Sequence, residues 1–227
     1  MAEANGRERF RELLERARGS AGGKLTLGSA ALAVDVEARP RWELAELAGR
    51  TVELSTDGAH GCSLTLAMGL VAQAHASGET AAWVWAAPGV FFPPDAAAAG
   101  ADLDALVVVR VPDARAGGRA ADKLLRSGGF GLVVLDLGDG LAAGRALTPA
   151  LQGRLQALAE RHRCTLMCLT DKKAGAGSLG SSVSLHATSR RRCDGGVWTC
   201  ELTVHKDRRR GPGWTHKERL RGPPGLR

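Results

Sequence analysis

The sequence predicts an α/β fold, a mostly parallel twisted sheet flanked by helices, with a C-terminal antiparallel hairpin and an N-terminal amphipathic helix. Three observations predict it. β-runs alternate with helical patterns through most of the chain, which is typical of parallel strands joined by crossover helices. Several of these β-runs are apolar throughout, as strands buried on both faces are. Near the C-terminus two β-runs instead follow each other through a turn-forming segment, Cys193-Asp-Gly-Gly196.

The first expected element is a helix over Arg7–Arg18, because Phe10, Leu13, Leu14 and Ala17 recur at helical spacing. Gly19–Gly23 then provides a flexible joint, so residues 1–23 form a unit that stands apart from the body. The alternative is that the helix packs on its own domain.

The core domain is expected to span residues 24–205. A short β-run precedes each helical pattern, and each helix has a face of apolar or small residues. The expected strands are 51–54, 80–85, 106–111, 130–137 and 164–169, the helices 64–75, 116–127 and 149–162, and the C-terminal β-runs 182–190 and 197–206.

One segment has the layout of a phosphate-binding loop without its charge. Residues 56–63 read Thr-Asp-Gly-Ala-His-Gly-Cys-Ser, where such a loop reads G-x-x-x-x-G-K-[ST]. Gly61 and Ser63 match, whereas Thr56 stands at the first glycine and Cys62 at the lysine. A predicted strand before the segment and a predicted helix after it supply the context that the motif requires. Because a thiol supplies no cation for the phosphates, the segment points away from ATP hydrolysis.

Composition bounds the class of protein. At 227 residues, with 44% hydrophobic and 24% charged residues, the chain suits one globular domain with short extensions. It contains no apolar run of membrane-spanning length, and its first residues are charged, so we expect a cytoplasmic protein without membrane contact. Its five cysteines form no C-x-x-C pair. We therefore expect neither a metal nor a disulfide, and no cofactor.

The formal net charge of +7 lies mainly in residues 206–227, which hold eight Lys/Arg and two acids. The same segment is rich in Pro and Gly, which predicts a tail without regular structure. Such a basic tail is a candidate contact for nucleic acid or for an acidic partner. A solvated tail that aids solubility is the alternative.

The order of elements and the motifs resemble the RecA recombinase superfamily over residues 24–208. Gly49–Leu54 resembles the segment before that family's phosphate loop. Asp136, which closes Leu-Val-Val-Leu-Asp, matches the acid that supports Mg²⁺ through water. Residues 100–106, followed by Pro112-Asp113, resemble the adenine-contacting region. The resemblance implies a RecA-like core.

Several family residues are replaced. Ala87 stands where the family has the glutamate that activates water, and Thr170-Asp171 stands where an Asn-Gln pair senses the γ-phosphate. Losing one transition-state stabiliser typically costs about 10²–10³-fold in rate. The resemblance and its departures together imply a pseudo-ATPase. The vestigial nucleotide site comprises Thr56, Gly61, Cys62, Ser63, Ala87 and Asp136.

Two basic segments are candidate DNA contacts. Residues 172–182 resemble a shortened form of the family's second DNA loop and offer Lys172 and Lys173 to phosphates, although a mobile solvent loop is the alternative. Lys206 and Arg208 resemble the Lys-x-Lys pair that reaches a neighbouring subunit's nucleotide. The candidate DNA contacts are Lys172, Lys173, Lys206, Arg208, Arg209 and Arg210.

Within the superfamily, the closest likeness is to ImuA, a family of short RecA-like accessory proteins found with error-prone polymerases. Residues 102–110, 124–136 and 180–185 resemble that family, as does the basic tail. The resemblance implies a role in the SOS response to DNA damage, in translesion mutagenesis. The implied partners are RecA and the polymerase-like subunit of the mutasome, with DNA as a candidate through the tail.

The resemblance also implies a route to RecA. RecA protomers join partly through an N-terminal helix, and Phe10, Leu13 and Leu14 give this chain a comparable apolar face. Two other classes of function stay open. One is an unconventional ATPase that uses Ser63 and Asp136 for Mg²⁺. The other is a single-stranded DNA-binding module that works through the tail and the Lys172 segment.

Overall fold

The computed structural model describes residues 40–56, 61–86, 91–173, 175–194 and 197–221. The chain clusters into two compact units, Met1–Arg39 and Pro40–Arg227, and the described elements belong to the second. The predicted N-terminal helix, with Phe10, Leu13 and Leu14, lies outside the described residues. No helix in the described ranges is long and apolar enough to cross a membrane.

The expected strands and helices of the core are present, with ends that shift by a few residues. The short helices α2, α4 and α6 and the last strand, β8, were not expected. In chain order the described elements are α2 (Leu44–Leu47), β1 (Thr51–Thr56), α3 (Ser63–Ala76), β2 (Ala81–Trp85), α4 (Pro93–Ala98), β3 (Leu106–Arg110), α5 (Ala114–Ser127), β4 (Leu132–Asp139), α6 (Gly140–Ala146), α7 (Pro149–His162), β5 (Thr165–Asp171), β6 (Leu185–Asp194), β7 (Val197–Asp207) and β8 (Thr215–Arg221).

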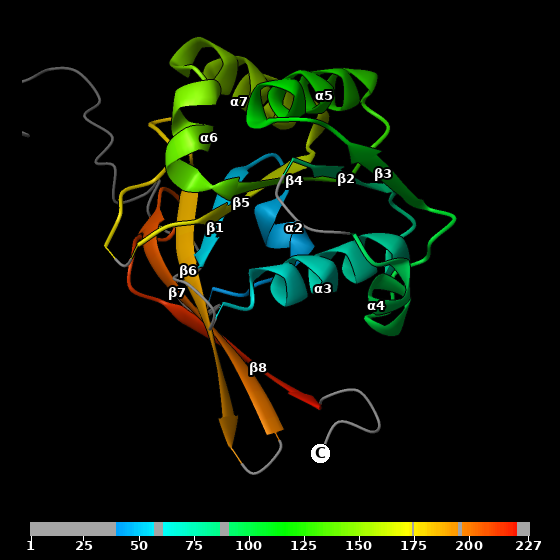
Figure 1. Ribbon diagram of the computed structural model, residues 1–227, viewed down its shortest axis with the longest axis vertical. Helices are drawn as coiled ribbons and strands as arrows, with labels where there is room; N and C mark the ends of the chain where they lie inside the picture. Colours follow the sequence, from blue (N-terminus) through cyan, green and yellow to red (C-terminus); the bar gives the residue numbers. More distant parts are fainter. Residues whose placement is uncertain (1–39, 57–60, 87–90, 174, 195–196, 222–227) are drawn as a thin grey trace, which may run out of the picture. The chain divides into compact units, whose positions relative to one another are not determined.

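All eight of these strands form one sheet in the order β3-β2-β4-β5-β1-β6-β7-β8 (Figure 1). β1 runs parallel to β5 and β6, and β2 runs parallel to β3 and β4. Only the β6–β7 and β7–β8 pairs are antiparallel. The predicted α/β sheet with a C-terminal antiparallel hairpin is therefore confirmed. In a parallel sheet the carboxyl ends of the strands share one edge, which is where sites form.

Two helical layers cover the sheet, with α2, α3 and α4 on one face and α5, α6 and α7 on the other (Figure 1). The face toward α3 buries Val52 and Leu54 of β1 against Leu66 and Leu70. The other face buries alternate residues of the same sheet against α5 and α7, including Leu166 beneath α7. β2, β4 and β5 are thus apolar on both faces, whereas β1 has the buried polar residues Thr51, Glu53 and Ser55 on its second face.

The helices of the second layer have well-defined ends and a close contact. The Asp113 carboxylate accepts a hydrogen bond from the Ala116 N–H at 2.7 Å and caps α5, and Gly128 ends that helix at φ +68°. Gly118 permits the approach of α5 to α7, since a Cβ there would lie 2.8 Å from Leu151 and 2.7 Å from Leu147. A larger residue at position 118 would require the side chains of Leu147 and Leu151 to shift.

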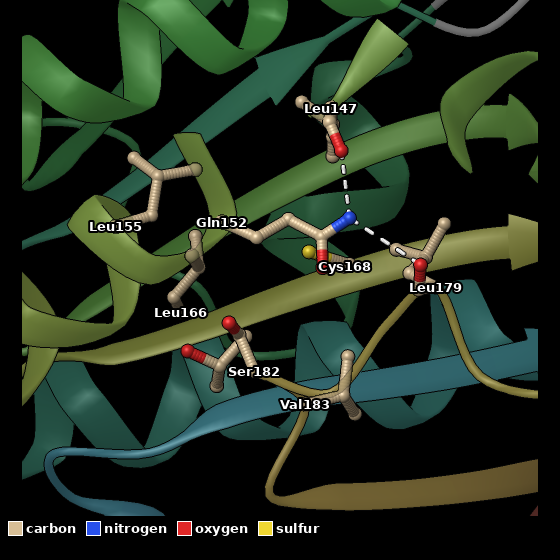
Figure 2. A pocket seen from close by; sticks show the side chains of 9 residues that line it. Leu147, Gln152, Leu155, Leu166, Cys168, Leu179, Ser182 and Val183 are labelled. Carbon is tan, nitrogen blue, oxygen red and sulfur yellow. Dashed lines mark hydrogen bonds between the residues drawn. The ribbon is translucent and has the colours of Figure 1, made fainter. Parts of the chain in front are cut away.

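A small apolar pocket lies under α7, over the first residues of β1 and β5 (Figure 2). Gln152 closes it, because its side-chain NH₂ donates to the carbonyl oxygens of Leu147 at 2.7 Å and Leu179 at 3.3 Å. The second bond fastens Leu179 to α7. The pocket is a packing hollow away from the carboxyl edge of the sheet, and it is lined by Thr51, Leu147, Gln152, Leu155, Leu166, Cys168, Leu179, Ser182 and Val183.

The expectation that residues after Lys206 lack regular structure is wrong for β8. β7 continues to Asp207, and residues 215–221 pair antiparallel with it. Three of the Gly and Pro residues that suggested a tail without regular structure, residues 211–213, lie in the turn between the two strands, where Gly211 and Gly213 adopt φ values of +80° and +98°. The other four, residues 222–225, lie outside the described residues. β8 gives no strand signal in the sequence because its residues, Thr-His-Lys-Glu-Arg-Leu-Arg, are polar except for Leu220.

The antiparallel strands extend beyond the parallel part of the sheet. β6 pairs with β1 only over Leu185–Ser189, and from Arg190 to Asp194 it pairs only with β7. β8 continues along the outer edge of β7 (Figure 1). We call residues 190–194, 197–201 and 217–221 the arm.

Candidate functional site

The described ends of the predicted phosphate-loop segment, Thr56 and residues 61–63, lie at the carboxyl end of β1, as expected. β1 ends at Thr56 and α3 begins at Ser63. Asp136 on β4 and Asp171 at the end of β5 reach the same edge. Of the vestigial site, Ala87 lies outside the described residues, as do residues 57–60 of the loop.

Cys62 occupies the lysine position of the motif and is buried in the core. It is 4% exposed and packs in the cluster that holds Leu202 and Cys200 of β7. Its backbone N–H donates to the Ser189 hydroxyl at 3.3 Å. A hydrogen bond with the Cys200 thiol, together with burial, raises the pKa of the Cys62 thiol. The position that carries a cation in a working phosphate loop is therefore neutral and closed to solvent.

Thr56 and Gly61, at the two glycine positions, contact each other. A Cβ atom at Gly61 would collide with the Thr56 side chain, so the glycine is required by this packing. The Thr56 hydroxyl donates to the Asp171 carboxylate. Ser63, the first residue of α3, is 7% exposed. The first glycine of the motif is thus replaced by a side chain that fastens β1 to β5.

Asp136 lies beside this contact in a partly buried position. Burial, reinforced by the negative charge of Asp171, raises its pKa from 3.8 to about 6. Hydrogen bonds from the Trp83 side chain and the Gly138 backbone oppose the shift. The structure therefore brings Thr56, Asp136 and Asp171 together and withdraws Cys62 into the core.

Lys172, a candidate DNA contact, is instead part of a buried ion pair. Its ammonium group contacts the Glu53 carboxylate, and both side chains are almost fully buried, at 6% and 0% exposure. Lys172 also donates to the Gly177 carbonyl at 2.9 Å. Glu53 in turn accepts from the Thr170 hydroxyl at 3.0 Å and the Leu179 N–H at 2.6 Å. The expected phosphate contact of Lys172 does not fit this placement, whereas Lys173 is exposed.

Glu53 was missed as an important residue because it reads as one position in a short β-run. The available signal was a carboxylate in the middle of a strand that is otherwise buried. Such a group requires a partner.

The basic residues after β7 fasten the sheet to α2. Arg209 donates to the Glu46 and Ala48 carbonyls at 3.3 and 3.2 Å, and Arg210 binds the Glu46 carboxylate at 2.9 Å. Arg208 donates to the Ser181 carbonyl. These three candidate DNA contacts are therefore engaged by the protein itself.

A second buried ion pair involves Asp207, the last residue of β7. Arg50 and Asp207 meet at 2.7 Å with both side chains buried, at 4% and 0% exposure. The Arg50 guanidinium, the Trp214 indole and backbone N–H groups hold the pKa of Asp207 below its ordinary value, although burial opposes them. Lys206 is partly buried, which lowers its pKa. The start of the predicted tail is thus a structural part of the core.

No known family model matches the chain, and no curated protein is significantly similar to it.

Proposed function

We propose that this protein is a non-catalytic, RecA-like accessory protein of the DNA damage response. It acts in translesion mutagenesis by contact with RecA, the polymerase-like mutasome subunit, or both. The observation that carries the proposal is Cys62, which stands at the lysine position of a phosphate-loop layout and is buried and uncharged.

The chemistry of nucleotide turnover supports this proposal. A phosphate loop needs a cation for the β- and γ-phosphates, and its backbone needs room to approach them. Here the cation is replaced by a core thiol, and the first glycine by Thr56, whose hydroxyl is bound to Asp171. Removing one transition-state stabiliser typically costs about 10²–10³-fold in rate, and several are replaced here. A protein with this site is better suited to binding a partner protein than to hydrolysing a nucleotide.

The arrangement of the core also supports the proposal. The strand–loop–helix unit of β1 and α3, with Asp136 two strands away at the same edge, agrees with the RecA-like expectation from the sequence. A RecA-like protein that does not use ATP could cap or decorate a RecA filament without extending it. Such capping would temper recombination and favour lesion bypass.

RecA-driven strand exchange, titrated with this protein, tests the proposal, with co-precipitation of RecA from the same samples. We expect inhibition that rises with concentration, together with direct association. Phe10→Asp combined with Leu14→Asp should weaken both effects, because these residues form the expected docking face.

The matched control is Arg11→Gln with Arg18→Gln, which changes the net charge equally but lies off that apolar face. If the protein neither inhibits strand exchange nor associates with RecA, the RecA route is contradicted. The polymerase-like subunit is then the partner to test. Equal effects of the two double variants would remove the helix from the account.

A further inference from the structure

β3 is an apolar edge strand of the sheet. It stands first in the strand order, and among the described strands it pairs with β2 alone (Figure 1). Val107 and Val108 are exposed at 43% and 42%. They lie on opposite faces, because neighbouring residues of a strand point to opposite sides. An edge strand of this kind offers its free backbone groups and its side chains to another strand.

The backbone groups that point to the open edge follow from the pairing with β2. The Ala105 C=O accepts from the first residue of β2 at 3.3 Å, and the Val111 N–H donates to the last residue of β2 at 3.0 Å. Since the groups of alternate residues point to opposite edges, the odd-numbered residues of β3 face β2. Val108 and Arg110 therefore turn their N–H and C=O groups to the open edge.

The opposite edge of the sheet is protected by charge. β8 carries Lys217, Glu218 and Arg219 in succession, and charged side chains on an edge strand discourage further pairing. The segment from Ala105 to Val109 contains neither a charge nor a proline. β3 is therefore the edge suited to accept a further strand.

The sequence of β3, with the two residues before it, is complementary to itself. Residues 104–110 read Asp-Ala-Leu-Val-Val-Val-Arg. In an antiparallel pair of two copies centred on Val107, Asp104 lies opposite Arg110, and the apolar residues lie opposite one another. Opposite charges directly across such a pair stabilise it. A parallel pair would instead place each charge beside its like.

These two charges have no opposite partner within their own chain. Neither Asp104 nor Arg110 forms an ion pair in the described ranges. The Arg110 guanidinium lies over the Trp85 ring, 5.1 Å from its centroid, at the end of β2. Both charges are exposed and free to pair across the edge.

Apolar side chains beside the edge enlarge the surface. Trp83 is the cross-strand neighbour of Val108, and its ring centroid lies 5.9 Å from that of Phe91. The next residue, Phe92, is 57% exposed, and Leu103 before β3 is 43% exposed. Burial of such side chains adds to the stability that backbone hydrogen bonds give a contact.

We propose that β3 pairs antiparallel with β3 of a second copy of this chain, about a two-fold axis at Val107, and joins the two sheets edge to edge. The Val108 N–H donates to the Leu106 C=O of the second copy, and Arg110 pairs with its Asp104. Such a contact closes at two copies, because the same edge is used on both sides. The inference goes beyond the proposed function, since it requires neither RecA nor a nucleotide.

Sedimentation equilibrium of the full chain, from low to high micromolar concentration, tests the pairing. We expect a monomer–dimer equilibrium. Val108→Pro should abolish the dimer, because proline removes an N–H that points to the open edge and leaves the bonds to β2 in place. The matched control, Val108→Thr, keeps this N–H and should still dimerise. Circular dichroism shows whether each variant is folded.

Exchange of the two charges tests whether the occupant is a second copy. Arg110→Asp and Asp104→Arg should each weaken the dimer at least about tenfold, because each turns two attractive pairs into two repulsive ones. An equimolar mixture of the two variants should dimerise again, since opposite charges then face each other across the edge. Arg190→Asp, at an exposed arginine of the arm, is the control and should have no effect.

Disulfide cross-linking tests the register. In a Cys193→Ser background, which removes the exposed native thiol, Val107→Cys should form a disulfide between two copies when oxidised glutathione accepts the electrons. The two introduced thiols then lie directly opposite each other. Val108→Cys is the control at an equally exposed site. It should cross-link far more slowly, because its two copies are diagonal, about 7–8 Å apart.

Three results would overturn the inference: a monomer at every concentration, a dimer that survives in Val108→Pro, and a mixture of the charge variants that associates no better than its components. A dimer that is lost in Phe10→Asp with Leu14→Asp but kept in Val108→Pro would also overturn it, in favour of the N-terminal segment. RecA association that persists in monomeric Val108→Pro would leave the proposed function intact, so the two proposals fail separately.

Discussion

The thiols of Cys62, the residue before α3, and of Cys200 on β7 interact with each other. Both side chains lie in the core on the α3 face of the sheet. The position that would carry the phosphate-binding lysine is therefore part of the packing between a helix and a strand. Introducing a lysine there would insert a charge into an apolar cluster without exposing it to a ligand.

Cys62→Lys should destabilise the protein by about 3 kcal/mol or more, because it buries an ammonium group without a counter-ion. It should not create ATP binding. Urea unfolding measures the first effect and titration calorimetry the second. The control, Cys62→Ala, removes only the thiol and should cost less. A stable lysine variant that binds ATP·Mg²⁺ would contradict the assignment of this position to the core.

The five cysteines should differ sharply in reactivity with a thiol reagent. Cys193 is exposed, while Cys62, Cys164, Cys168 and Cys200 are buried. Burial raises the pKa of Cys164 and of Cys168 to about 12, so few of these thiols ionise. One thiol should react quickly in the native protein, and Cys193→Ser should abolish that phase. Rapid reaction of several thiols would show that the core is more open than described.

Asp136 predicts a dependence of stability on pH. Burial raises its pKa from 3.8 to about 6, so the folded protein holds its proton more tightly than the unfolded chain. The contribution of Asp136 to the free energy of unfolding therefore falls as the pH rises from about 4 to 6, and it stays low above pH 6. Asp136→Asn should match the wild type near pH 4 and exceed it by about 1–3 kcal/mol near pH 8.

Urea unfolding at several pH values measures this difference. The control is Asp104→Asn, which changes an exposed carboxylate. If the stability of Asp136→Asn followed the wild type in parallel over the whole range, the raised pKa would be wrong.

The buried pair of Glu53 and Lys172 predicts a non-additive result. Glu53→Gln leaves a buried ammonium group without its counter-ion and should cost about 3–5 kcal/mol. Lys172→Met should also destabilise, whereas the double variant should be more stable than either single variant. The neighbouring exposed Lys173→Met serves as control and should change stability by less than about 0.5 kcal/mol. Additive costs in a double-mutant cycle from urea unfolding would contradict the pair.

The fold class could be predicted because most of the central strands are apolar and alternate along the chain with helical patterns. β1, β4 and β5 are buried on both faces, and α7 begins and ends where the sequence indicates. α2, α4 and α6 span four, six and seven residues, too few to show a helical period. β8 was missed because it has no apolar face of its own. Its pairing with β7 is what makes it a strand.

The candidate site could be located but not described in full. Strand order at the carboxyl edge is implied by a parallel sheet, so Asp136 and the segment around Thr56 could be placed together. The sequence shows Lys172, Arg209 and Arg210 as surface charges, because their partners Glu53 and Glu46 are more than a hundred residues away along the chain. Pairing over that separation becomes visible only in the folded chain.

Calorimetric titration of the full chain with ATP·Mg²⁺ tests the central claim most directly. The account predicts no saturable heat, because the phosphate-binding cation is absent and the thiol in its place lies in the core. Saturable, tight binding that is lost in Ser63→Ala and in Asp136→Ala would contradict the account. It would instead establish an unconventional nucleotide site at the carboxyl edge of the sheet.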